Sequence, residues 1–266
     1  MVGARNPRPD IGRRWLASRR VDPSTQIKYE IAWRLPVEPT FGRRSVAAIK
    51  PGDIQGWLAR LGESYGTATL ATAYVVLYGI MELAIADGQR RDNPARSEIV
   101  TKPSARATPE KAQAWPDAVV WSIIDAHPAQ LRLLPVLMAG CGIRIGEGLA
   151  LDEADFDWDR HILHVRRQLK KLGKHHVFAL PKNDRERDVP MADWVKIVAR
   201  QHFATTATRP VTLPWEKPGR TLLTVQLSFR SISDRFVPYR GYRRRDVEAG
   251  ARACRCHTAA DAEGSV

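Results

Sequence analysis

A group of glycines around one arginine gives this chain a segment that is suited to binding phosphate. Arg144 lies among Gly140, Gly142 and Gly146 at the predicted start of a helix, and Glu147 follows about one helical turn later. A planar guanidinium donates two parallel charge-assisted hydrogen bonds to phosphate oxygens, and the N–H groups at a helix start add further donors. Glu147 is placed to orient the guanidinium, although an ordinary surface ion pair has the same i,i+3 spacing.

A second group of cations follows within the next forty residues. Positions 160–188 hold nine Lys or Arg residues and three acidic residues. Such an excess of positive charge is typical of a face that contacts the phosphates of DNA. The cations that we expect on this face are Arg166, Arg167, Lys170, Lys171, Lys174, Arg185 and Arg187.

Helical elements are predicted to fill the first part of the chain. Apolar residues recur at three-to-four spacing, and we expect helices over residues 25–35, ending at Pro36, from Lys50-Pro51 onward, and over residues 67–86. Asp87-Gly88 and Asn93-Pro94 provide the stop signals for the last of these helices. Residues 97–107 lack apolar periodicity and have the composition of a linker.

The elements that carry the two cationic segments belong to a second predicted domain. We expect a helix start at Thr108-Pro109-Glu110 and helices over residues 119–126, 128–140 and 192–203. Alternating sequence predicts short strands over residues 154–157, 161–169 and 175–180. The expected fold class is therefore mainly α, with an all-helical module followed by a mainly helical domain that bears a small antiparallel β-sheet.

Four regions are expected along the chain. They are a basic flexible arm (1–20), a helical DNA-binding domain (21–104), the domain with the two cationic segments (105–226) and an arginine-rich tail without helical periodicity (227–266). A merely solvated, disordered terminus explains the composition of the arm equally well.

The bulk composition favours a polyanionic partner. Forty-two Lys and Arg residues against 29 Asp and Glu give a net charge of +13, which favours nucleic acid first and an anionic membrane surface second. No apolar segment is expected to be long enough to span a membrane; the longest candidate, residues 131–143, is interrupted by Arg132 and Pro135. With no apolar run after the first arginines, we expect a cytoplasmic protein.

Cysteine usage argues against a disulfide framework or a metal centre. The chain has three cysteines, and the set Cys254, Cys256 and His257 is too small to close a four-ligand zinc site alone. We expect no metal and no cofactor.

The order of these motifs resembles that of the tyrosine recombinase (phage integrase) family over about residues 24–200. The segments at 39–43, 49–57 and 87–95 are similar to the core-binding, SAM-like domain of these proteins. The Arg144 turn and the segment from Pro181 to Met191 resemble the front half of the catalytic domain. The resemblance implies double-stranded DNA as the partner and a homo-oligomer on that DNA.

The resemblance also implies roles for individual residues. Members of this family break a DNA strand by attack of a tyrosine oxygen on phosphorus, with cations to stabilise the oxyanions and an acid to protonate the leaving oxygen. Arg144 matches the first arginine of the family, and Lys182 matches its hairpin lysine, which acts as general acid. Lys182 has the same setting as an ordinary turn lysine, and Lys170, Lys171 and Lys174 compete for the assignment.

The end of the chain departs from the family pattern. No His-x-x-Arg box follows, and from about Ser228 the sequence turns arginine-rich, with Tyr239 and Tyr242 as its only tyrosines. We expect a truncated or frameshifted, catalytically incomplete integrase with a disordered tail. Without the later helices of the family, the apolar patch of Leu133, Leu134, Leu137 and Met138 should be exposed. The alternatives are a non-catalytic DNA-binding regulator on the same scaffold and an intact recombinase that uses Tyr239 or Tyr242 as nucleophile.

Overall fold

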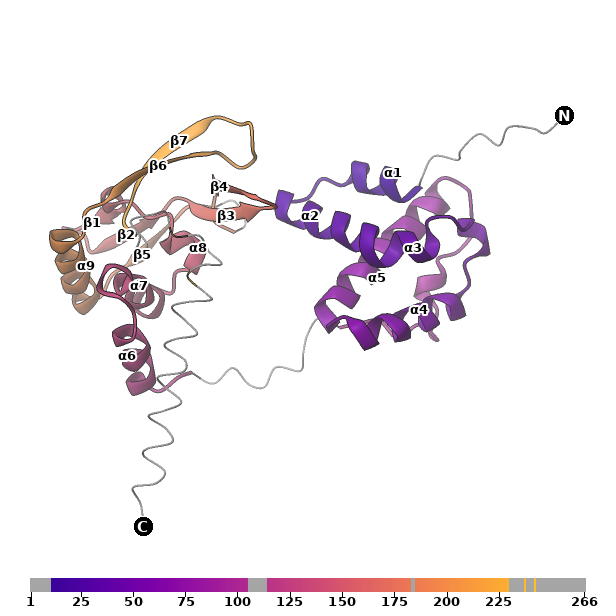
Figure 1. Cartoon of the computed structure of the whole chain (residues 1–266), viewed down its shortest axis with the longest axis horizontal. Coiled ribbons are helices and arrows are strands. Elements are labelled where there is room, and N and C mark those ends of the chain that lie inside the picture. Colours follow the sequence, from indigo (N-terminus) through magenta and orange to yellow (C-terminus); the bar gives the residue numbers. More distant parts are fainter. Residues whose placement is uncertain (1–10, 105–113, 183–184, 230–236, 238–241, 243–266) are drawn as a thin grey trace, which may run out of the picture. The chain divides into compact units, whose positions relative to one another are not determined.

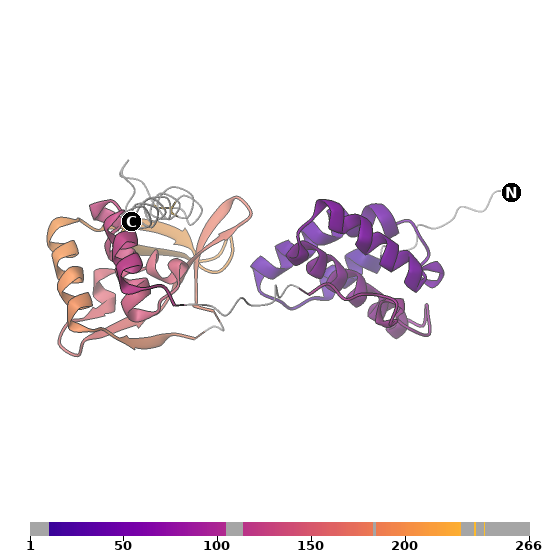
Figure 2. The same ribbon diagram turned by 90° about the horizontal axis from the view of Figure 1, so that it is seen from below.

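The computed structural model describes residues 11–104, 114–182 and 185–229, together with Val237 and Tyr242. The chain forms two compact units, residues 1–112 and 113–266, each with its own hydrophobic core (Figure 1). The first unit is helical in all its regular elements, and the second combines helices with short antiparallel strands (Figure 2). The expected mainly α fold class is confirmed.

The first unit consists of five α-helices and three short turns of other helix types among its described residues. The α-helices are α1 (Ile11–Ser18), α2 (Pro23–Ala32), α3 (Glu38–Phe41), α4 (Pro51–Ser64) and α5 (Thr67–Ala86). A π-helical turn (Trp33–Val37) joins α2 to α3, and 3₁₀ turns lie at Val46–Ala48 and Pro94–Arg96.

Helix α1 corrects the predicted flexible arm. Residues 11–18, which we assigned to that arm, form a helix whose Trp15 is only 4% exposed. The Trp15 indole lies directly over Gly79 of α5, where a Cβ atom would come within 2.4 Å of the ring. The sequence did not predict this helix because its arginines suggested a solvated segment. They occupy the exposed side of the helix, while Trp15 and Leu16 pack inward. Residues 1–10 of the expected arm lie outside the described residues.

Pro36 does not end the helix, contrary to our prediction. The backbone widens to a π-helical turn around Pro36, in which the N–H of Glu38 donates to the carbonyl of Trp33. The chain then continues directly into α3. The Pro36 carbonyl accepts a hydrogen bond from Trp57 Nε1 at 3.1 Å, so α4 uses an acceptor in the region that the proline distorts.

Helix α5 is the central element of the first unit. It has 20 residues, and an 18-residue window of it has a mean hydropathy of 1.7. The helix is therefore long and apolar enough to cross a membrane by length and composition, which corrects our expectation that no segment is. Core helices of globular domains meet the same criteria. Seven α5 residues are buried in this unit: Ala73, Tyr74, Val76, Leu77, Ile80, Met81 and Ala84.

The predicted linker is partly packed against the first unit. Val100 is 4% exposed and belongs to the core of this unit, and the Thr101 N–H donates to the Gln55 side chain at 2.9 Å. Residues 105–113, including the expected helix start at Thr108, lie outside the described residues.

Within the part of the second unit that the structure describes, there are four α-helices, two 3₁₀ turns (Ala129–Leu131 and Glu153–Asp155) and three small antiparallel sheets. Its helices are α6 (Asp117–Asp125), α7 (Leu133–Cys141), α8 (Ile145–Gly148) and α9 (Asp193–Thr205). The sheets have the strand orders β1-β2-β5, β3-β4 and β6-β7. The strands are β1 (Phe156–Asp157), β2 (Ile162–Val165), β3 (Gln168–Leu172), β4 (His175–Ala179), β5 (Arg187–Pro190), β6 (Arg209–Pro214) and β7 (Leu222–Leu227).

The core of the second unit includes residues of the predicted tail. Phe229, Val237 and Tyr242 are 2%, 5% and 1% exposed and belong to the same cluster as α7. The tail boundary at 226/227 and the prediction of a wholly disordered tail are therefore wrong for these residues. The remaining residues from 230 onward, including Tyr239, Cys254 and Cys256, lie outside the described residues.

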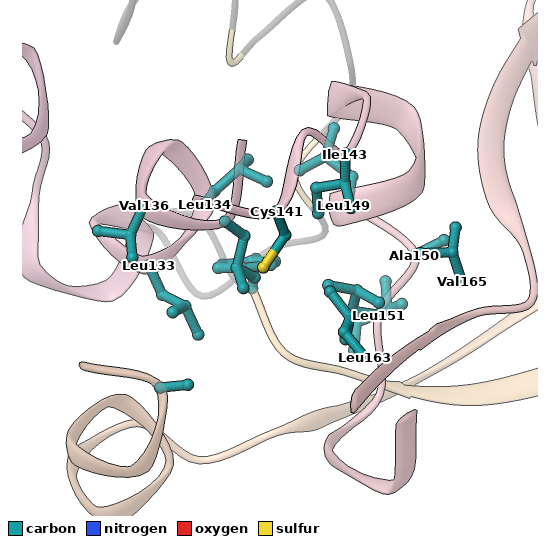
Figure 3. Close-up of a cluster of buried hydrophobic side chains, with 14 of the residues drawn as sticks. Leu133, Leu134, Val136, Cys141, Ile143, Leu149, Ala150, Leu151, Leu163 and Val165 are labelled. Atoms are coloured by element: carbon teal, nitrogen blue, oxygen red, sulfur yellow. The ribbon is translucent and has the colours of Figure 1, made fainter. Parts of the chain in front are cut away.

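The apolar patch expected on α7 is covered. Figure 3 shows Leu133 and Leu134 beside Cys141, Leu149 and Leu151 in the core of this unit. Leu137 is fully buried as well, whereas Met138 is 37% exposed. Our expectation of an exposed patch is corrected for its three leucines, because residues from the end of the chain join the cluster that packs around them.

Candidate functional site

The turn between α7 and α8 places Arg144 at the surface. Gly142 ends α7 in the left-handed region at φ 62°, a conformation that costs glycine little. Arg144 then adopts extended backbone and its N–H donates to the Glu147 carboxylate at 2.8 Å, which fixes the start of α8. Gly146 brings α8 close to β3, since a Cβ atom there would lie 3.0 Å from the Leu169 carbonyl oxygen. The Arg144 side chain remains 57% exposed.

Glu147 is the centre of a three-residue charge cluster. Its side chain is fully buried and accepts hydrogen bonds from Arg144 Nη1 at 3.0 Å and from Arg187 Nη1 and Nη2 at 3.0 and 2.7 Å. Burial alone would raise the pKa of the Glu147 carboxyl, but the hydrogen bonds from Arg187 and Arg144 outweigh it and the pKa is lowered. Glu147 is therefore a carboxylate at neutral pH.

Arg187 belongs to this cluster, which differs from its expected place on the DNA-contacting face. It is the first residue of β5, and its hydrogen bonds to Glu147 raise the pKa of its guanidinium. Nη1 and Nη2 of Arg187 each donate to one oxygen of the Glu147 carboxylate, so the guanidinium forms a bidentate pair within the protein. The sequence contained no signal for this pair, because its members are 40 positions apart.

Lys182 lies in the turn after β4 and is exposed. Two residues before it, the Leu180 carbonyl accepts a hydrogen bond from the Gln168 side chain of β3. Asn183 and Asp184 lie outside the described residues. The assignment of Lys182 as a general acid stays a prediction.

Exposed cations remain on and beside the β3-β4 hairpin. Lys171, Lys174 and Arg185 are exposed and Lys170 is half-buried. The hairpin turns at Gly173, whose φ of 59° lies in the left-handed region. The exposed ones are accessible to phosphate groups, and their role as DNA contacts stays a prediction.

Arg167 does not belong to that surface, which corrects our prediction. Its side chain is 12% exposed, and Nη1 and Nη2 donate to the Asp155 carboxylate at 3.3 and 2.6 Å. Arg166 lies 3.6 Å from the same carboxylate and is 47% exposed, so it is still accessible. Burial raises the pKa of Asp155 despite these arginines, and the carboxyl is a buried structural partner that our sequence analysis missed.

Tyr242 is not placed to attack a phosphate, which corrects its candidacy as nucleophile. It is 1% exposed, and its hydroxyl lies 2.9 Å from Nε2 of His127. A carbonyl can only accept, so Nδ1 of His127 donates to the Ile123 carbonyl at 2.6 Å, and Nε2 forms the hydrogen bond with the Tyr242 hydroxyl. His127 is itself buried, and its role as partner was missed as well. Tyr239 lies outside the described residues.

The described residues were also compared with the requirements of a metal site and of a reactive cysteine. Among the residues that the structure describes, no group of three His, Cys, Asp or Glu side chains could hold a metal ion. Burial raises the pKa of the Cys141 thiol to about 11, so this cysteine is a thiol at neutral pH. The set at 254–257 lies outside the described residues.

Comparison with known sequences identifies phage integrases as relatives. The integrase of Mycobacterium phage D29 is 28% identical over 199 residues, which are 72% of this chain and 50% of the relative. The integrase of Mycobacterium phage L5 is 27% identical over 197 residues, with 72% and 51% covered. The chain thus spans about half the length of the curated relatives it matches. No protein-family model matches the chain.

Comparison with solved structures gives the same fold. The Tn1549 transposon integrase in complex with transposon right end DNA aligns with a TM-score of 0.72 at 19% identity, covering 88% of this chain and 74% of that chain. A lambda integrase tetramer bound to a Holliday junction aligns with a TM-score of 0.66 at 14% identity, covering 91% and 65%.

Proposed function

We infer that this chain, a homologue of phage integrases with the fold of the tyrosine recombinases, binds duplex DNA in site-specific recombination. The observation that carries the proposal is the Arg144 turn, in which a buried carboxylate holds an exposed guanidinium at a helix start. The exposed cations Lys171, Lys174 and Arg185 supply the charge for the flanking phosphates. We place this function in the cytoplasm, with several copies of the chain on one DNA.

The proposed contribution of Arg144 is to bind the phosphate that other members of the fold cleave. Of its guanidinium nitrogens, Nη1 is the one with a described contact to Glu147, and the side chain is 57% exposed, so part of the guanidinium is open to solvent. A phosphate at that edge receives charge-assisted hydrogen bonds without displacing the carboxylate. Lys182 would be the proton donor to a departing sugar oxygen only in the alternative in which the chain cleaves the strand.

Strand cleavage needs a nucleophile in addition to these cations. Tyr242 is buried against His127, and the other described tyrosines, Tyr29, Tyr65, Tyr74 and Tyr78, belong to the first unit. We therefore propose DNA binding without covalent strand cleavage as the activity of this chain. A non-catalytic regulator of recombination is the second candidate function, and the burial of Tyr242 is the observation that favours it.

Binding is tested by titrating a labelled duplex with the full chain at several salt concentrations. The logarithm of the affinity should fall linearly with the logarithm of the salt concentration, with a slope of about −0.9 for each phosphate neutralised. The double variant Lys171→Gln and Lys174→Gln should reduce that slope by about 2. An affinity that does not depend on salt would remove DNA from the expected partners.

Cleavage is tested with a nicked duplex that traps a covalent intermediate. The full chain should give no adduct that survives denaturation, because a cation without a positioned nucleophile does not cleave the strand. An adduct that disappears in Tyr239→Phe would restore the intact recombinase, and one that disappears only in Tyr242→Phe would require that residue to leave the core.

A further inference from the structure

We propose that Arg187 is a positioning residue, which holds the buried Glu147 carboxylate through a bidentate pair and so leaves the Arg144 guanidinium available to a phosphate. The inference rests on the proposed function, because it concerns the same phosphate-binding site. It replaces the direct DNA contact that we expected of Arg187 from the sequence.

The hydrogen bonds of Glu147 form a closed set. Oε1 accepts from Arg144 Nη1 and Arg187 Nη1, and Oε2 accepts from the Arg144 N–H and Arg187 Nη2. Arg144 and Arg187 therefore share the two oxygens of one fully buried carboxylate. A displacement of Arg187 frees one site on each oxygen.

Described residues on each side of positions 183–184 have partners in this unit. Gln168 of β3 donates to the carbonyl of Leu180, two residues before Lys182. Arg187 is bound to Glu147 five residues after Lys182. β3 in turn packs closely on Gly146 of α8, so the elements that carry Gln168 and Glu147 are adjacent.

The charges of the cluster support the same role. One carboxylate and two guanidiniums leave a net charge of +1; Arg187 supplies two of the four described hydrogen bonds to the buried carboxylate, and Arg144 stays 57% exposed. Without Arg187, Glu147 would have Arg144 as its remaining cationic partner, and the pair would have no net charge. Arg187 thus preserves the charge that Arg144 offers to a phosphate.

A comparison of three variants of the full chain tests the proposal on a labelled mixed-sequence duplex. Arg187→Gln removes the charge and the fork, Arg187→Lys keeps only the charge, and Arg185→Gln removes one charge from an exposed neighbour. We expect Arg187→Gln and Arg187→Lys each to weaken binding at least threefold more than Arg185→Gln. In a Glu147→Gln background, the excess effect of Arg187→Gln should disappear.

Direct contact of Arg187 with DNA gives the opposite pattern. Arg187→Lys would then bind like the unmodified chain, Arg187→Gln would match Arg185→Gln, and the Glu147→Gln background would change neither effect. That result would overturn the proposal.

A second measurement needs no DNA and separates this proposal from the proposed function. The Glu147 carboxyl can be titrated by ¹³C NMR in the free protein. Its midpoint should rise in both Arg187 variants and stay unchanged in Arg185→Gln, because Arg187 donates to this carboxylate and Arg185 is not among its described donors. An unchanged midpoint in Arg187→Gln would refute the proposal that Arg187 holds the Glu147 carboxylate. Failure of the unmodified chain to bind DNA would refute the proposed function, while the titration would still decide whether Arg187 holds Glu147.

Discussion

At the scale of single residues, the buried Glu147 carboxylate stays ionised because neighbouring arginines donate hydrogen bonds to it. Its carboxylate has no exposed surface, and hydrogen bonds from Arg144 and Arg187 replace those of water. Glu147→Gln should lower the free energy of unfolding by about 2 kcal/mol at pH 7, because hydrogen bonds to charged groups contribute about 1.5–3 kcal/mol. Denaturant titration measures this loss, and Glu153→Gln, at an exposed acidic position, should leave the stability within about 0.5 kcal/mol of the unmodified chain.

The loss in Glu147→Gln should also depend on pH. The pKa of Glu147 is lowered in the folded protein, so its charge stabilises the fold above the ordinary carboxyl pKa, and this contribution is lost as the pH falls through the folded value. The difference between the unmodified chain and Glu147→Gln should therefore be largest near neutral pH and should shrink below about pH 4.5. A constant difference from pH 7 to pH 3.5 would mean that the ionised carboxylate is not what stabilises the cluster.

Sequence separation decided which parts of this site could be predicted. Arg144 and Glu147 are three positions apart at a helix start, and local helix geometry brings such residues together whatever the rest of the fold does. Arg187 reaches Glu147, and Tyr242 reaches His127, only through tertiary packing, over 40 and 115 positions. Composition placed Arg187 among the DNA contacts and Tyr242 in a disordered tail, because it reports charge and periodicity but no long-range partner.

At the scale of elements, the packing of α1 on α5 can be tested at Gly79. A Cβ atom there would lie 2.4 Å from the Trp15 indole, which is rigid and buried, so Gly79→Ala must displace α1. We expect a loss of about 2 kcal/mol in the free energy of unfolding, as is typical of an overpacked core. Gly56→Ala of α4 is the matched control, since the nearest atom to its new Cβ is 3.6 Å away and alanine favours a helix by about 1 kcal/mol. Equal effects of the two substitutions would show that α1 does not dock on α5.

Elements were predicted well where their signals lie within the segment. The helix over residues 67–86 matches α5, and Lys50-Pro51 marks the start of α4, because capping residues and apolar spacing are local features. No strand was predicted over residues 209–214 or 222–227, which form the β6-β7 hairpin, and β6 contains two prolines, which are uncommon within strands. Pro210 and Pro214 are tolerated in a sheet of only two strands, where each strand has one unpaired edge.

At the scale of the whole chain, the two units have separate hydrophobic cores with no residue in common among those described. Such units should unfold in two calorimetric transitions, and a substitution in one core should move only one of them. Tyr242→Ala removes a buried aromatic ring from the core of the second unit, which should cost that unit about 3–5 kcal/mol. Gly79→Ala should lower the other transition alone.

The Tyr242 substitution also decides whether the end of the chain belongs to the fold. Tyr242→Phe keeps the packing of the ring and loses its hydrogen bond to His127, so it should cost about 1 kcal/mol. Differential scanning calorimetry of the full chain would measure both variants against the unmodified protein. If Tyr242→Ala left both transition temperatures unchanged, Tyr242 would not stabilise the second unit. Other residues would then have to cover the apolar side of α7. A larger loss of stability in Tyr242→Ala than in Tyr242→Phe would instead identify residue 242 as part of the core that positions Arg144 and Glu147.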